Sequence, residues 1–176
     1  MQFFYKFVLN RTWAFIDIVK PPSVRSLPDI PTTEEITRLL RASRESQVYT
    51  FILTTYSMGL RLGEALNLSV NDIDSKRMRV HLRACKGRKD RYIPLPAQAL
   101  AALRTHWKTH RNARWIFPQG RDREAKHQAP KPMNRSLPQR AMRKLVKECR
   151  INKEVILHSL RHSLASHLLE EGLSEF

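Results

Sequence analysis

Two short segments of the chain alternate apolar and polar residues, and the other periodic segments follow a helical spacing. Residues 78–83 and 92–95 have the two-residue period of half-buried strands. Lys86 and Gly87 lie between them, as expected at the tip of a β-hairpin. The pattern therefore predicts a mainly α-helical fold with a small antiparallel β-hairpin, in the α+β class.

The helices are predicted from apolar spacing and from end signals. Thr32 and Glu35 form a capping-box pattern, which predicts a helix from there to about Ala42. Gly59 is expected to end the second helix, and Gly172 the last one. The other predicted helical segments are 47–58, a turn at 64–68, 96–110, 137–149 and 158–170. Residues 118–138, rich in Pro, Gln and charge, are predicted to form a mobile loop.

The beginning of the chain differs from the rest. Aromatic residues recur at helical spacing within residues 1–20, which predicts a short amphipathic helix that docks on, or belongs to, a larger body. Residues 21–31 hold four prolines and no periodicity, so an extended linker is expected there. Residues 32–176 remain as the main domain.

The charge of the chain points to a polyanionic partner. Its 32 Lys and Arg against 16 Asp and Glu give a formal net charge of +16. Nucleic acid is the first candidate and an acidic membrane surface the second; a solvated basic surface or a ribosomal-type protein is the plain alternative. Residues 104–150 hold 14 basic and 3 acidic residues, interleaved with Trp107, Trp115 and Phe117. A basic surface that is also packed is suited to following phosphates.

Several classes of protein are disfavoured by composition. Cys85 and Cys149 lie far apart, in neither a disulfide framework nor a metal-ligand spacing. We therefore expect no metal site and a reducing, cytoplasmic location. No apolar run approaches the ~20 residues of a membrane span.

Four residues are candidates for chemistry. Arg61 lies among core residues and needs an anion, either Glu64 three residues on or two oxygens of a phosphate. His158 and Arg161 would share one face at a helix start, where free N–H groups already favour an anion. A simple helix cap is the alternative for His158. Lys86, at a hairpin tip, is either solvated or placed near a leaving oxygen in a DNA groove.

The order and separation of these motifs resemble the catalytic domain of tyrosine recombinases, or phage-integrase-type site-specific recombinases. The matching segments are 59–68, 72–74, the hairpin at Lys86 and 158–172, and the resemblance covers about residues 28–176. It implies that residues 1–20 are a remnant of the last helix of a DNA-gripping core-binding domain.

The resemblance also implies roles for individual residues. Arg61 and Arg161 match the arginines that hold the scissile phosphate, Lys86 the lysine that protonates the leaving 5′ oxygen, and His158 an acid/base helper. Glu64 matches an acidic position that we interpret as structural. Fixed guanidinium groups stabilise the charge of an attacked phosphodiester, so no metal or cofactor is required. The partner is double-stranded DNA, and its expected further contacts are Arg88, Lys89, Arg135, Arg140, Arg143 and Lys144.

One feature of the family is not matched. The family continues with a tyrosine nucleophile, and none of the four tyrosines here corresponds to it: Tyr5, Tyr49, Tyr56 and Tyr92. The chain therefore looks truncated at both ends relative to the family, with a catalytic domain lacking its C-terminal end. We expect it to bind DNA, to form a homo-oligomer on DNA, and not to cleave alone.

Three alternatives remain open at this point. The first is a non-catalytic DNA-binding or regulatory protein that keeps the recombinase fold. The second is a half-enzyme that receives its tyrosine from a partner. The third is a basic RNA-binding protein, which would prefer RNA to duplex DNA.

Overall fold

The structure is a computed structural model, and it describes residues 29–83 and 90–172. The helix expected within residues 1–20, most of the linker expected at 21–31, and the hairpin tip with Lys86 lie outside the described residues. The division of the chain into these parts therefore stays a prediction.

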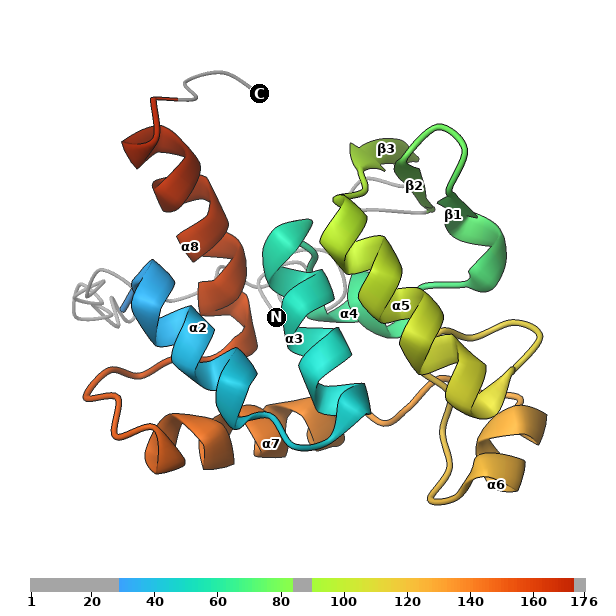
Figure 1. Ribbon diagram of the computed structural model, residues 1–176. Coiled ribbons are helices and arrows are strands. Elements are labelled where there is room, and N and C mark those ends of the chain that lie inside the picture. The colour runs from blue at the N-terminus through green and yellow to red at the C-terminus, as the bar shows by residue number, and fades with distance from the viewer. Residues whose placement is uncertain (1–28, 84–89, 173–176) are drawn as a thin grey trace, which may run out of the picture.

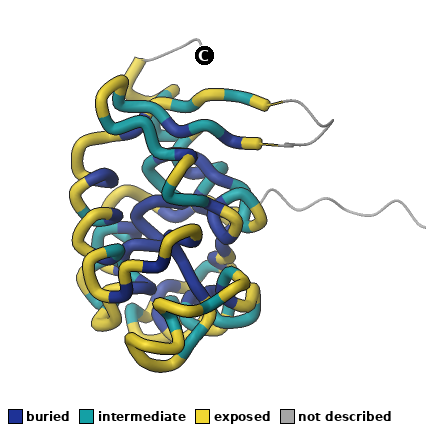
Figure 2. The backbone as a smooth tube through the Cα atoms, turned by 90° about the vertical axis from the view of Figure 1, so that its right-hand side faces the viewer, coloured by how far each residue is buried: buried dark blue, intermediate teal, exposed yellow. Residues whose placement is uncertain are grey.

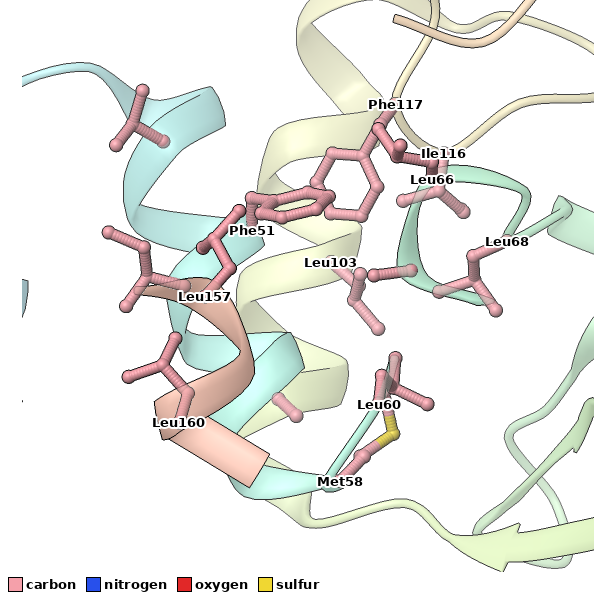
Figure 3. Packing of buried hydrophobic residues seen from close by; sticks show 14 of the residues in the cluster. Phe51, Met58, Leu60, Leu66, Leu68, Leu103, Ile116, Phe117, Leu157 and Leu160 are labelled. Atoms are coloured by element: carbon pink, nitrogen blue, oxygen red, sulfur yellow. The ribbon is translucent and has the colours of Figure 1, made fainter. Parts of the chain in front are cut away.

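Helix α3 (Ser46–Ser57) lies at the centre of the helical part, between α5 (Ala97–His110) and α8 (Leu157–Glu170) (Figure 1). Eight of its residues are buried, including the run from Thr50 to Thr55. Phe51 meets Phe117 edge-on, with ring centroids 5.1 Å apart, within the large hydrophobic cluster that also includes Leu103 and Leu157 (Figure 3). A helix buried nearly all round must be covered on several sides, so its neighbours are fixed in place around it.

The first described helix, α2 (Thr33–Ala42), starts where the capping box predicted. Thr32 Oγ1 accepts the Glu35 N–H, and Glu35 Oε2 accepts the Thr32 N–H at 2.8 Å. The Lys153 ammonium, before α8, donates to Glu35 Oε2 at 2.8 Å and to the Ile30 carbonyl at 3.1 Å. The Glu154 N–H donates to Asp29 Oδ2 at 2.8 Å, so the start of the described chain is tied to the segment before α8.

The small sheet has three antiparallel strands in the order β1-β2-β3. The predicted strands are β2 (Arg79–Leu82) and β3 (Arg91–Pro94), and His81 pairs with Tyr92 in their register. The third strand, β1 (Ile73–Asp74), was not predicted, because two residues are too few to show alternation. The sheet lies on the opposite side of the molecule from α2 (Figure 1).

The prediction of a loop over residues 118–138 was wrong in part, because α6 (Arg123–Gln128) lies within it. Asp122 caps α6 by accepting the Ala125 N–H at 2.8 Å. The buried Asn112 side-chain amide donates to the carbonyls that end α6, those of Lys126, His127 and Ala129, at 2.8–3.1 Å. These bonds reach back 14 to 17 residues, so the local sequence does not reveal them.

The last two helices are α7 (Ser136–Glu148) and α8, close to their predicted bounds. Helix α7 contacts α2, α3 and α8 through an apolar face that includes Met142 and Leu145. Buried segments run through the middle of the molecule and exposed ones form its outer turns (Figure 2). Among the described helices, none combines the length and apolar character needed to cross a membrane.

Candidate active site

The turn between α3 and α4 (Leu62–Leu66) places Arg61 at the edge of the core. Gly59 has φ +57°, a conformation that favours glycine, and a Cβ there would meet Leu164 of α8 at 3.1 Å. Leu60 is buried beside Met58 (Figure 3). Arg61 is the next residue and the N-cap of α4, so its backbone is fixed from the core side while its side chain stays 38% exposed.

Glu64 holds Arg61 through both its backbone and its side chain. Arg61 Nη1 donates to Glu64 Oε1 at 2.9 Å, and the Arg61 N–H donates to Oε2 at 2.8 Å. A second arginine, Arg91 of β3, donates to the same Oε2 at 3.0 Å. Burial raises the pKa of Glu64, but the hydrogen bonds from Arg61 and the charges of both arginines outweigh it, so the pKa is lowered.

The sequence left two possible anions for Arg61, Glu64 or a phosphate, and the structure contains the ion pair with Glu64. It leaves part of the guanidinium exposed, so the pair does not exclude a phosphate as a second partner.

Helix α8 brings His158 and Arg161 to the same turn. Arg161 Nη1 donates to the Gly59 carbonyl, two residues before Arg61. The His158 ring stands edge-on to His162, with centroids 4.5 Å apart. Burial, followed by the charges of His162, Arg161 and Arg61, lowers the pKa of His158. An imidazole with a lowered pKa is neutral at neutral pH and able to accept a proton.

Arg61 faces an open groove of about 880 Å³. The groove runs between α4, the 3₁₀ turn η1 (Val70–Asp72), strand β2 and the start of the segment after α5. Its two acidic groups are engaged, Glu64 as described and Asp72 with Arg83 at 2.8 Å. Other side chains that line it are Asn67, Asn71, His81, Arg114 and Trp115. The guanidinium of Arg61 is therefore accessible from a broad groove of mixed polar and apolar character.

Four of the six predicted DNA contacts lie in the described part of the chain. Arg135 is the N-cap of α7, and Arg140, Arg143 and Lys144 lie along it, all exposed. Lys144 reaches Glu148 at 3.8 Å, a weak exposed pair. Arg88 and Lys89, like Lys86, lie outside the described residues. These contacts stay predictions.

One partner in the site, Arg91, was missed from the sequence. It lies 27 residues from Glu64, beyond the reach of helical spacing rules.

In the described ranges, no group of three or more His, Cys, Asp or Glu side chains could hold a metal ion.

Comparison with known proteins identifies the family. The phage integrase family matches residues 31–175, so the chain belongs to that family. A Sinorhizobium fredii protein that carries the name integrase/recombinase y4qK is 35% identical over 173 residues, which are 98% of this chain and 54% of that protein. Tyrosine recombinase XerA of Thermococcus kodakarensis is 34% identical over 161 residues, with 88% and 54% covered.

Solved structures agree with this assignment. A crystal structure of XerA recombinase matches with a TM-score of 0.68 and 25% identity, over 84% of this chain and 53% of that one. A lambda integrase tetramer bound to a Holliday junction matches in fold, with a TM-score of 0.66, 17% identity, and 85% and 45% covered. The predicted fold class and family are confirmed. The chain spans about half the length of these relatives.

Proposed function

We propose that this chain supplies the phosphate-binding part of a site for DNA strand transfer in site-specific recombination. The observation that carries the proposal is the turn at Gly59, where Arg161 is bonded to the Gly59 carbonyl and Arg61 follows two residues later. His158 lies within the electrostatic reach of both arginines. Two guanidinium groups fixed before the reaction stabilise charge on the non-bridging oxygens of a phosphodiester without reorganisation.

The proposed reaction exchanges one phosphoester bond for another. A tyrosine hydroxyl attacks the phosphorus, a 3′-phosphotyrosyl bond forms, and the bond to the 5′ oxygen breaks. The proton of the tyrosine passes to a base such as neutral His158, and Lys86 gives a proton to the leaving 5′ oxygen. The phosphotyrosyl bond conserves the energy of the phosphodiester, so the reverse attack by a 5′ hydroxyl completes strand transfer.

We propose that the attacking tyrosine is none of the four in this sequence. The Tyr56 hydroxyl lies 2.9 Å from His167 Nδ1, and burial, followed by the charge of Glu171, raises its pKa. Tyr92 is stacked on His81 and carries the Arg79 guanidinium 4.3 Å from its ring centroid. Of the three described tyrosines, Tyr56 and Tyr92 therefore have structural partners, and Tyr49 is half-buried on α3. The raised pKa of Tyr56 also makes it a poor nucleophile.

Duplex DNA is the proposed partner, bound through the exposed cations of α7 and through Arg61 and Arg161. The net charge of +16 supports this choice. A homo-oligomer on DNA is proposed as well, because strand exchange requires more than one cleaved site. Some structural relatives are recorded as a tetramer or a dimer on DNA.

A salt titration with a duplex DNA tests the binding part of this proposal. The affinity should fall steeply as salt rises, because each neutralised phosphate releases counterions. Arg140→Gln and Arg143→Gln should each reduce the slope of log affinity against log salt by about 1. A flat salt dependence, or a preference for duplex RNA, would contradict the proposal.

A nicked duplex that traps covalent intermediates tests the catalytic part. The chain alone should give no covalent band. A band should form when a tyrosine-bearing relative is added whose own two phosphate-binding arginines have been replaced, so that it gives no band by itself. That band should be lost with Arg61→Gln or Arg161→Gln. If both variants retain the covalent band, the two arginines do not activate the phosphate. If no covalent band forms under any condition while both variants still bind DNA, the alternative of a non-catalytic DNA-binding protein is supported.

A further inference from the structure

The carboxylate of Glu64 is shared by two arginines from different elements. Its side chain is 10% exposed, and it accepts three hydrogen bonds, two from Arg61 and one from Arg91. Oε2 serves both the backbone of Arg61 and the guanidinium of Arg91. The three side chains together, one nearly buried carboxylate and two guanidinium groups, have a net charge of +1, whereas a simple ion pair is neutral.

Arg91 is well placed to act on Arg61 at a distance. It is the first residue of β3 and pairs with Leu82 of β2, so its backbone is fixed in the sheet. Its side chain is only 33% exposed and reaches α4 through Glu64. The bond thus joins the sheet to the helix whose N-cap is Arg61.

The shared carboxylate has a consequence for the charge available on Arg61. If Glu64 faced Arg61 alone, both carboxylate oxygens could accept from its guanidinium in a bidentate, neutral pair. Oε2 accepts from the Arg61 backbone N–H and from Arg91, so the Arg61 guanidinium makes a single bond to the carboxylate, from Nη1 to Oε1. Among the described residues, its other N–H groups therefore remain for an incoming anion.

We propose that Arg91 is a positioning residue: by sharing Glu64, it fixes the guanidinium of Arg61 and keeps its free N–H groups and positive charge directed at a phosphate. This inference rests on the proposed function, in which Arg61 binds the phosphate. Arg91 itself does not contact the phosphate.

The test measures the affinity of the full chain for tungstate, a tetrahedral oxyanion that stands in for the phosphate, from the NMR signal of the His158 ring. Arg91→Gln should weaken tungstate binding by about fivefold, because Arg61 is then held less firmly and can turn a second N–H group to Glu64; fivefold corresponds to about 1 kcal/mol, the net contribution of one ordinary hydrogen bond. Arg91→Lys keeps the charge and should recover part of the affinity. Thermal unfolding of each variant shows whether it is folded. If Arg91→Gln does not fold, the tungstate affinity of Arg91→Lys, compared with that of the natural chain, decides the test.

Arg79→Gln is the matched control. Arg79 lies on β2 of the same sheet, is 34% exposed, and pairs with a carboxylate, Asp74, at 3.4 Å. The substitution removes the same charge from the sheet without touching Glu64. It should change tungstate affinity by less than about twofold, as expected for a screened surface charge. Equal losses in Arg91→Gln and Arg79→Gln would overturn the inference.

A double-mutant cycle separates action through Glu64 from direct contact with the anion. In a Glu64→Gln background, Arg91→Gln should cause no further loss, because the shared carboxylate is already gone. A full additional loss would mean that Arg91 binds the anion itself, and the positioning role would be wrong.

Arg61→Gln distinguishes failure of the inference from failure of the proposed function. If Arg61→Gln binds tungstate as tightly as the natural chain, the proposed phosphate site fails. If Arg61→Gln loses binding while Arg91→Gln matches Arg79→Gln, only the positioning role fails.

Discussion

Mild acid is expected to destabilise the protein through two buried histidines on α5. His106 and His110 are 2% and 1% exposed, with ring centroids 5.0 Å apart. Within the described structure, neither ring nitrogen of His106 has a hydrogen-bond partner, and Nε2 of His110 has none. A proton on His106 would therefore be a buried charge without an acceptor. Burial, followed by the charges of His110 and Lys126, lowers the pKa of His106 from 6.5 to about 4.

The size of the effect follows from the two pKa values. The unfolded chain binds a proton at His106 below about pH 6.5, and the folded chain only below about pH 4, so stability is full above this window and falls through it. The complete loss is about 3 kcal/mol at 1.36 kcal/mol per pH unit. Between about pH 7.5 and 5.5 the loss is about 1.3 kcal/mol. Glu35 and Glu64 have lowered pKa values and lose their stabilising charge only at more acidic pH.

Urea unfolding at about pH 7.5 and 5.5 measures this loss, provided that the transition is two-state. His106→Phe is the comparison, because phenylalanine can keep the stacking on Phe117, whose ring centroid lies 5.5 Å from that of His106, and does not titrate. The natural chain should lose about 1.3 kcal/mol more than the variant over this range. Equal losses in both proteins would refute the assignment of the acid sensitivity to His106.

Three further substitutions have expected costs. Asn112→Ala should lower the free energy of unfolding by about 3 kcal/mol, because a buried amide is lost whose two N–H groups are shared among three carbonyls and whose oxygen accepts from the Arg114 and Trp115 N–H groups. Hydrogen exchange should show the amides of α6 exposed first. Thr32→Ala removes the cap that Glu35 completes and should cost about 1 kcal/mol in urea unfolding, whereas Thr32→Ser should cost less. Tyr56→Phe removes the bond to His167 and should cost about 1 kcal/mol, with a changed His167 ring signal in NMR spectra.

Features that depend on neighbours in the sequence were predictable. The capping box of Thr32 and Glu35, the helix end at Gly59 and the pairing of β2 with β3 are each specified within a few residues, and the structure has all three. The Arg61–Glu64 pair follows from helical spacing in the same way.

Features that depend on distant residues were not predictable. Helix α6 is held by Asn112, which precedes it by ten residues or more. The half-buried Tyr56 places its hydroxyl 2.9 Å from His167 Nδ1, on a helix 111 residues further along the chain. Arg91 completes the environment of Arg61 only after the sheet has formed beside α4. Single-sequence patterns carry no signal for such pairs.

The ties between the start of the described chain and the segment before α8 affect the order in which the protein can fold during synthesis. Glu35 and Lys153 are separated by 118 residues, and Asp29 and Glu154 by 125. At about 5–20 residues per second, a ribosome needs roughly 6 to 24 seconds to make the intervening chain. Helix α2 cannot gain these contacts during that time, so its fixed position is expected to be among the last features that the nascent chain acquires.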